Sequence, residues 1–97
     1  MSKFDVYRTE GGYLLDIQAD FLNHLGTRVV VPLLPTRTTP PSAKGLNPIF
    51  RIEDDEVVMA TQLLAAVPRS MLKSSVTNLS NQHDKIVAAV DFLMQGF

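Results

Sequence analysis

Cysteine and tryptophan are both absent from the 97-residue chain. Without cysteine there can be no disulfide, no thiolate metal ligand and no cysteine nucleophile, which fits a reducing compartment. A surplus of either charge is also lacking, because nine basic and ten acidic residues give a net charge of −1. Proteins that bind nucleic acid by neutralising phosphates need a basic surplus, so this balance disfavours direct nucleic-acid binding.

Long hydrophobic runs are missing as well. No segment approaches the ~18 consecutive apolar residues of a membrane span. Residues 1–5 contain no apolar stretch and already carry an acid at Asp5, unlike a secretory signal. We therefore expect a cytoplasmic protein without a membrane partner. The length and the 45% hydrophobic content predict one folded domain over residues 1–97.

Alternating apolar and polar residues predict β-strands in the first two thirds of the chain. Residues 3–9 and 13–19 have the pattern of a hairpin, and Gly11 and Gly12 are expected to supply the positive φ angles of its turn. The β-branched run at residues 28–31 predicts a buried strand. Further strands or short apolar strand segments are expected at residues 49–52, at 57–61, around Val67 and at 71–72.

Proline interrupts this pattern. Pro32 and Pro35 are expected to end regular strand pairing or to confine it to a sheet edge, because proline has no amide hydrogen. Five of the fourteen positions from Pro35 to Pro48 are proline or glycine. This segment predicts a loop that is too long for a hairpin, and loops of that size are often functional.

The last segment changes to the period of a helix. An apolar stripe recurs at steps of four, three and four, at Ile86, Val90, Leu93 and Phe97. A second face is small and polar, at Asp84, Ala88, Asp91 and Gln95. Ser80 is expected to cap the helix start, and Gly96 is expected to end it. The order of elements predicts a mainly β, α+β domain of five to seven antiparallel strands with one terminal helix.

Catalytic and metal-binding patterns are weak. His24 and His83 carry the only side chains whose ordinary pKa lies near neutrality, and both are expected to be solvated. The acidic run at residues 53–56 lacks the glycine and the spacing of a calcium loop and predicts a hairpin turn. No nucleophile elbow occurs, and we predict no catalytic residue, metal site or cofactor. These observations favour a binding protein over an enzyme.

Several short motifs occur in a recognisable order. They are Phe4–Tyr7, Asp16–Asp20, Gly26–Leu33, Ala66–Pro68 and the final Gly96–Phe97. Together they resemble the CcdB family of plasmid-type toxins, over essentially the whole chain. The resemblance implies an SH3-like barrel of antiparallel strands with a C-terminal α-helix, a fold shared with the ribonuclease toxins of the MazF and Kid type. It also implies a homodimer.

The resemblance further implies a function. CcdB-like proteins are toxins of type II toxin–antitoxin systems that serve plasmid maintenance. They bind the A subunit of DNA gyrase and trap the cleaved gyrase–DNA complex, and a CcdA-type antitoxin neutralises them. By position, the gyrase-binding residues would be Ala19, Phe21, Leu22, Asn23, His83, Val87, Ala88, Asp91, Gln95, Gly96 and Phe97. The dimer interface would include Leu93, Met94 and Phe97. We expect the antitoxin to use the loop at residues 35–48 and the neighbouring strands, a surface that is separate in part from the gyrase-binding residues.

One departure and two alternatives accompany this interpretation. Gln95 stands where the best-known family member has a tryptophan, so a cation–π contribution of roughly 0.5–2 kcal/mol would be lost. One alternative is an mRNA endoribonuclease of the MazF type, in which Arg28, Arg51, Thr61 or His24 would handle the RNA phosphate. The other is an inactive protein of the same fold that only binds an antitoxin.

Overall fold

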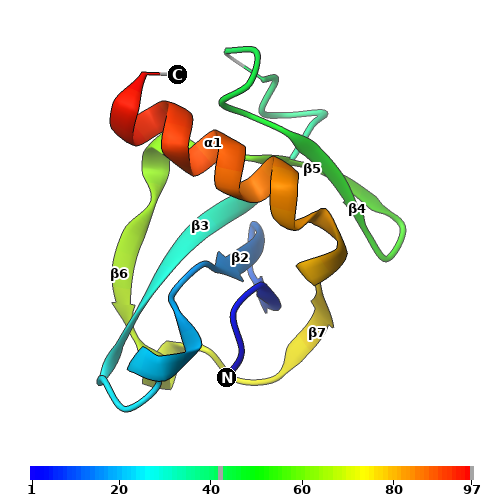
Figure 1. Cartoon of the computed structure of the whole chain (residues 1–97). Helices are drawn as coiled ribbons and strands as arrows, with labels where there is room; N and C mark the ends of the chain where they lie inside the picture. The colour runs from blue at the N-terminus through cyan, green and yellow to red at the C-terminus, as the bar shows by residue number, and fades with distance from the viewer. Residues whose placement is uncertain (42, 97) are drawn as a thin grey trace.

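A computed structural model of the chain describes residues 1–41 and 43–96, and Ser42 and Phe97 lie outside the described residues. The elements are β1 (Asp5–Thr9), β2 (Gly12–Asp16), η1 (Asp20–Leu22), β3 (Thr27–Pro35), β4 (Ile49–Ile52), β5 (Asp55–Met59), η2 (Thr61–Leu63), β6 (Ala65–Pro68), η3 (Arg69–Met71), β7 (Ser75–Asn78), η4 (Ser80–Gln82) and α1 (His83–Gln95), where η denotes a 3-10 helix. This order confirms a mainly β domain with a terminal helix (Figure 1).

The described strands form one antiparallel, seven-stranded sheet of order β4-β5-β3-β2-β1-β7, with β6 paired to β3. Two partners share one edge of β3, since β6 pairs with residues 27–30 and β5 with residues 33–35. The sheet curves into a half-barrel, and α1 lies across it (Figure 1). This architecture confirms the predicted SH3-like barrel with a C-terminal helix.

Pro32 does not end β3, contrary to the sequence prediction. The strand continues to Pro35, and Pro32 pairs with Leu14 of β2. On the opposite edge, Pro32 lies where β6 has ended and β5 has not yet begun. Its carbonyl accepts a hydrogen bond from Ala60 N at 2.9 Å on that edge. Because the N–H and C=O of a strand residue point to the same side, the missing amide hydrogen falls in the gap between two partners.

The predicted hairpin of β1 and β2 is present, with Thr9 opposite Gly12. The predicted reason for its glycines is wrong, since neither has a positive φ; positive φ angles among the described residues occur at Phe4, Gly45, Glu53 and Gly96. Gly12 is instead required by a close approach of two strands. A Cβ at this position would lie 2.3 Å from the carbonyl oxygen of Leu33.

The acidic turn between β4 and β5 is confirmed, with Ile52 opposite Asp55. Residues 71–72 and strand β7 differ from the sequence prediction. Residues 71–72 are not a strand: Met71 ends η3, and Leu72 is buried beside Tyr7 and Val30. Strand β7 was not predicted, because only Val76 in it is apolar.

The start of the terminal helix also differs from the prediction. Ser80 does not cap α1; it begins η4, and the Oδ1 of Asn78 accepts a hydrogen bond from its amide at 2.8 Å. Asp84 lies in the first turn of α1 as expected. Gly96 ends the helix at φ 80°, and its N–H donates to the carbonyl of Phe92 at 2.8 Å.

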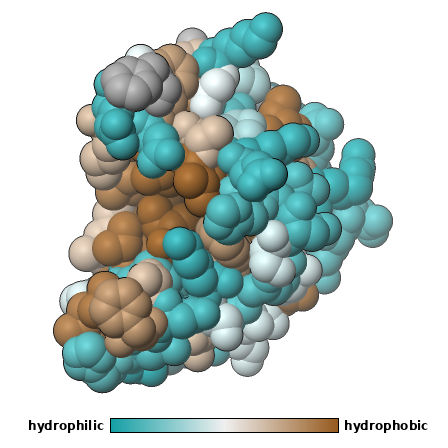
Figure 2. Space-filling model, viewed as in Figure 1, coloured by the Kyte–Doolittle hydropathy of each residue, from teal (hydrophilic) through white to brown (hydrophobic). Residues whose placement is uncertain are grey.

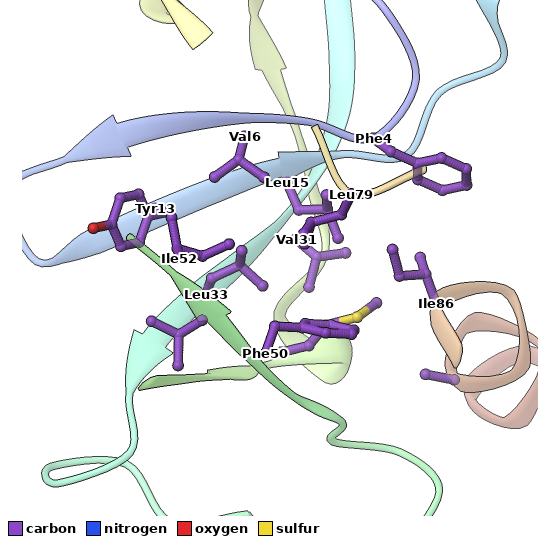
Figure 3. Close-up of a cluster of buried hydrophobic side chains, with 13 residues drawn as sticks. Phe4, Val6, Tyr13, Leu15, Val31, Leu33, Phe50, Ile52, Leu79 and Ile86 are labelled. Carbon is purple, nitrogen blue, oxygen red and sulfur yellow. The ribbon is translucent and has the colours of Figure 1, made fainter. Parts of the chain in front are cut away.

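The core lies between the curved sheet and α1, as Figure 3 illustrates. Its buried members are Phe4, Val6, Tyr13, Leu15, Val31, Leu33, Phe50, Ile52, Val57, Met59, Leu79, Ile86 and Ala89. The helix therefore packs through Ile86 and Ala89, while Val87 and Val90 are partly buried. Within the part of the chain that the structure describes, no helix is long and apolar enough to cross a membrane.

Candidate functional site

The most prominent apolar side chain on the described surface is Phe21, in η1. Its relative exposure is 80%, above that of any other large hydrophobic residue described. The other residues of this segment that were assigned to the predicted binding surface, Ala19, Leu22 and Asn23, are each half-buried. The segment therefore presents one aromatic ring to solvent and uses the residues around it as support. Exposed aromatic residues are common among the side chains that dominate binding energy.

The outer face of α1 forms the second part of the predicted site. Ala88 and Asp91 are exposed, and so are Gln95 and Gly96 at the helix end. Of the dimer residues, Leu93 is half-buried and Met94 is 64% exposed. Phe97, assigned to both predicted surfaces, lies outside the described residues. The face combines small and polar side chains, as its sequence pattern predicted.

A shallow hollow of about 190 Å³ separates α1 from the segment that leads into η1. Its lining residues are Lys3, Phe4, Ile17, Ile86, Val87, Val90 and Asp91. Figure 2 shows hydrophobic surface gathered around a hollow in the middle of this face, with hydrophilic residues at its right and lower sides. The hollow thus places Lys3, Phe4 and Ile17 next to Val87 and Asp91 of the predicted surface.

His83 begins α1 at the edge of this surface and is exposed. Its Nδ1 lies 3.2 Å from Oδ1 of Asp84, and its ring meets the ring of Phe4 edge-to-face with centroids 5.5 Å apart. Phe4 is buried at a φ of 73°, a conformation that bulky residues rarely adopt. The side chain of Phe4 therefore joins the N-terminal segment to the first turn of α1.

A buried ion pair supports the η1 side of the surface. The side chains of Asp16 and Arg28 have no exposed area. Arg28 Nε donates to Asp16 Oδ2 at 2.8 Å, and Nη2 lies 2.6 Å from the same oxygen as an ion-pair contact outside hydrogen-bond geometry. Arg28 Nη1 donates to Oδ1 of Asn23. One guanidinium thus connects β2, β3 and the end of η1.

The other oxygen of Asp16 is also engaged. Asp16 Oδ1 accepts the amide of Gln18 at 2.9 Å, and Gln18 in turn donates to the carbonyl of Leu22 at 3.1 Å. Burial raises the pKa of Asp16, while the Gln18 amide and the Arg28 guanidinium lower it. A buried carboxylate stays charged only while such partners remain in place.

A second cleft, of about 300 Å³, lies on the β1–β2 hairpin and is lined mainly by polar groups. Two of its charged residues have partners: Arg8 forms an ion pair with Glu53, and Asp55 accepts a hydrogen bond from the Tyr13 hydroxyl at 2.6 Å. That hydrogen bond and burial raise the pKa of Tyr13. This cleft contains no histidine.

The four residues considered for a ribonuclease do not form a site. Arg28 is enclosed and held by Asp16 and Asn23. Thr61 is fully buried, and its hydroxyl donates to the carbonyl of Leu46. Arg51 donates to the backbone of Asp54 in the β4–β5 turn, whereas His24 lies in the exposed turn before β3. Two of these groups are thus inaccessible, and the other two belong to separate elements, Arg51 to β4 and His24 to the turn before β3.

Comparison with known protein families shows to which family this chain belongs. The family described as "CcdB protein" matches residues 3–96. The chain belongs to the CcdB family. That membership makes it a toxin of a toxin–antitoxin system, and the resemblance seen in the sequence motifs is confirmed.

Solved structures are similar to this CcdB-family toxin at the level of the fold. A mycobacterial endoribonuclease in complex with its cognate antitoxin matches with a TM-score of 0.79 at 16% identity, over 97% of this chain and 94% of that one. A mycobacterial endoribonuclease matches with a TM-score of 0.77 at 16% identity, over 97% and 90% of the two chains. At this identity the likeness establishes the shared barrel and helix alone.

Sequence reasoning missed the residues that support the surface. Asp16, Gln18 and Arg28 were noted as motif positions, but their joint burial was not foreseen. One signal was available: Asp16 is the last residue of β2, directly after two leucines, and Arg28 immediately precedes a β-branched run. Charged residues in such settings are rarely tolerated without a partner.

We expect the two members of the buried pair to be more costly to remove singly than together. Asp16→Leu leaves Arg28 charged and enclosed, and Arg28→Met leaves Asp16 buried without its cation, so each should lower the free energy of unfolding by about 3–5 kcal/mol. The double variant Asp16→Leu/Arg28→Met should lose less than either single variant, because no unpaired charge remains. Urea denaturation of all four proteins measures these differences, and simple additivity would contradict the interpretation.

The pH dependence provides a check on the same pair. In Arg28→Met, Asp16 loses the cation that lowers its pKa, so burial should raise that pKa further. A raised pKa means that the folded state binds a proton more tightly than the unfolded state. The stability of this variant relative to the natural protein should therefore increase as the pH is lowered from neutrality towards the ordinary pKa of an aspartate, about 4. Unchanged stability over that range would contradict this assignment.

Proposed function

We propose that this toxin binds the A subunit of DNA gyrase and traps the cleaved gyrase–DNA complex. The observation that carries the proposal is Phe21, which lies on η1 and is 80% exposed. The proposed contacts are those implied by family position: Ala19, Phe21, Leu22, Asn23, His83, Val87, Ala88, Asp91, Gln95, Gly96 and Phe97. In this mode the protein acts by binding and performs no catalysis.

Burial and charge support this mode over RNA cleavage. Arg28 and Thr61 are enclosed and already hydrogen-bonded, so an RNA phosphate would have to displace buried partners to reach them. The net charge of −1 provides little attraction for a polyanion. The endoribonuclease alternative is favoured only by the fold of the two mycobacterial structures. Gyrase poisoning therefore ranks first.

The active form is proposed to be a homodimer that joins the C-terminal ends of two α1 helices. Met94 is 64% exposed and adjoins the half-buried Leu93, so a lone chain leaves an apolar helix end in water. The small residue Ala88 on the outer face permits close approach of a second helix. A symmetric pair would cover Leu93, Met94 and Phe97, and would present two copies of the gyrase-binding end side by side.

A CcdA-type antitoxin is proposed to bind the loop between β3 and β4. The second half of this loop is tightly held: Asn47 donates to the carbonyl of Met59 at 3.0 Å, and a Cβ at Gly45 would lie 3.1 Å from the Phe92 ring. Pro40, Pro41 and Lys44 stay exposed above these contacts. Because the loop touches Phe92 of α1, an antitoxin bound there would adjoin the helix that carries part of the gyrase surface.

For gyrase binding, we expect Phe21→Ala to weaken the trapping of cleaved DNA by at least tenfold. Truncating an exposed aromatic at the centre of an interface costs about 2 kcal/mol or more. The assay is DNA cleavage by gyrase as a function of toxin concentration. Leu25→Ala is the matched control, because Leu25 is an exposed apolar residue of the same turn outside the proposed contacts. RNA cleavage by the pure protein without gyrase would instead favour the endoribonuclease.

For the dimer, Met94→Lys should produce monomers, since two ammonium groups would be buried at the shared helix end. Light scattering at high micromolar concentration should give twice the chain mass for the natural protein and the single mass for the variant. Met71→Lys is the control, because Met71 is similarly exposed at 58% on η3, away from the proposed interface. A monomeric natural protein would overturn the proposal.

For the antitoxin, we expect amide hydrogen exchange within residues 36–48 to slow when the C-terminal segment of the antitoxin is added. A disordered partner orders on binding and covers the backbone beneath it. Exchange in the β4–β5 turn at residues 53–54 serves as the internal reference and should not change. If exchange stays the same throughout residues 36–48, the antitoxin binds elsewhere.

A further inference from the structure

The segment Asp20–Gly26, which carries Phe21, has little hydrophobic anchoring of its own. None of the three residues of η1 is buried. Phe21 is 80% exposed and Leu25 is 39% exposed. A short 3-10 turn without buried side chains gains little from packing, so hydrogen bonds from outside must hold it in place.

Arg69 supplies several of those hydrogen bonds from a distant part of the chain. It begins η3, directly after β6. Its Nη1 donates to the carbonyl of Asn23 at 2.6 Å and to the carbonyl of Leu25 at 3.3 Å. Its backbone N–H donates to the carbonyl of Gly26 at 3.0 Å. One residue therefore engages three of the last four carbonyls of the segment.

The other hydrogen bonds to the Asp20–Gly26 segment come from buried side chains or from the backbone, which cannot be removed without destabilising the fold. Gln18 and Arg28 hold Leu22 and the Asn23 side chain, but both are buried. The backbone amide of Lys3 donates to Oδ1 of Asp20 at 2.6 Å. Arg69 is only half-buried and is not part of the hydrophobic core. It is the one side chain of this set whose loss should leave the barrel intact.

We propose that Arg69 is a positioning residue, which holds the Asp20–Gly26 segment so that Phe21 is presented in a single place. The inference rests on the proposed binding of gyrase through Phe21. A charged guanidinium makes stronger hydrogen bonds to carbonyls than a neutral donor, and it binds two of them at once. Without it, the segment would sample other conformations, and only a fraction of molecules would present Phe21 correctly. Apparent affinity falls in proportion to that fraction.

The first measurement is hydrogen exchange in the full-length protein without any partner. The amides of Leu22, Asn23 and Leu25 donate to carbonyls within the turn, at 3.1, 3.0 and 3.1 Å. In Arg69→Ala these amides should exchange about tenfold faster, while the thermal midpoint moves by only a few degrees. Lys73→Ala is the matched control. Lys73 is exposed and lies, like Arg69, in the connection between β6 and β7, so this variant also removes one positive charge there. Equal exchange in both variants would overturn the inference.

The second measurement is a double-mutant cycle on binding to the dimerisation domain of the gyrase A subunit. Arg69→Ala should raise Kd about tenfold in the natural background and not at all in the Phe21→Ala background. A tenfold loss in both backgrounds would mean that Arg69 touches gyrase directly, and would overturn the positioning role. If the natural protein binds no gyrase, the proposed function fails. The exchange measurement then still decides whether Arg69 holds the segment.

Discussion

The buried ion pair of Asp16 and Arg28 is the interaction on which the site side of the molecule depends. Two opposite charges without exposed area can persist only if each has nearly all of its hydrogen-bonding groups engaged. That requirement places β2 and β3 in one register, in which Asp16 lies opposite Val30. The same guanidinium then reaches Asn23, so the position of the η1 segment follows from the ion pair. An apolar pair could fill this space but could not connect the core to a surface turn.

The other half of the proposed surface rests on packing. Ile86 and Ala89 bury one side of α1 against the sheet and leave Ala88 and Asp91 outward. A hollow of about 190 Å³ adjoins the helix and is lined by Lys3, Phe4, Ile17 and side chains of α1. A polar network therefore positions η1, while hydrophobic burial positions the helix. A partner that spans both would meet a surface that is already organised, which lowers the entropic cost of binding.

A barrel with a terminal helix does not by itself decide which chemistry a protein carries out. The fold of this chain matches endoribonucleases closely in shape at 16% identity. Yet the arginine and threonine most suggestive of RNA chemistry, Arg28 and Thr61, are used internally as hydrogen-bond donors in the core. The function of a protein with such a fold depends on which polar groups are exposed to solvent and which are buried in internal hydrogen bonds.

The sequence alone determined features that depend on neighbours in the chain. These are the hairpins, the long proline-rich loop, the two faces of α1 and the glycine that ends it, because spacing and backbone freedom act over a few residues. Its motifs also indicated the family. Only the tertiary structure decided that Pro32 lies between two partner strands, that Arg28 is enclosed, and that Arg69 reaches Asn23 from 46 positions away. Such contacts depend on how segments that are far apart in the sequence pack together, and a local sequence pattern does not contain that information.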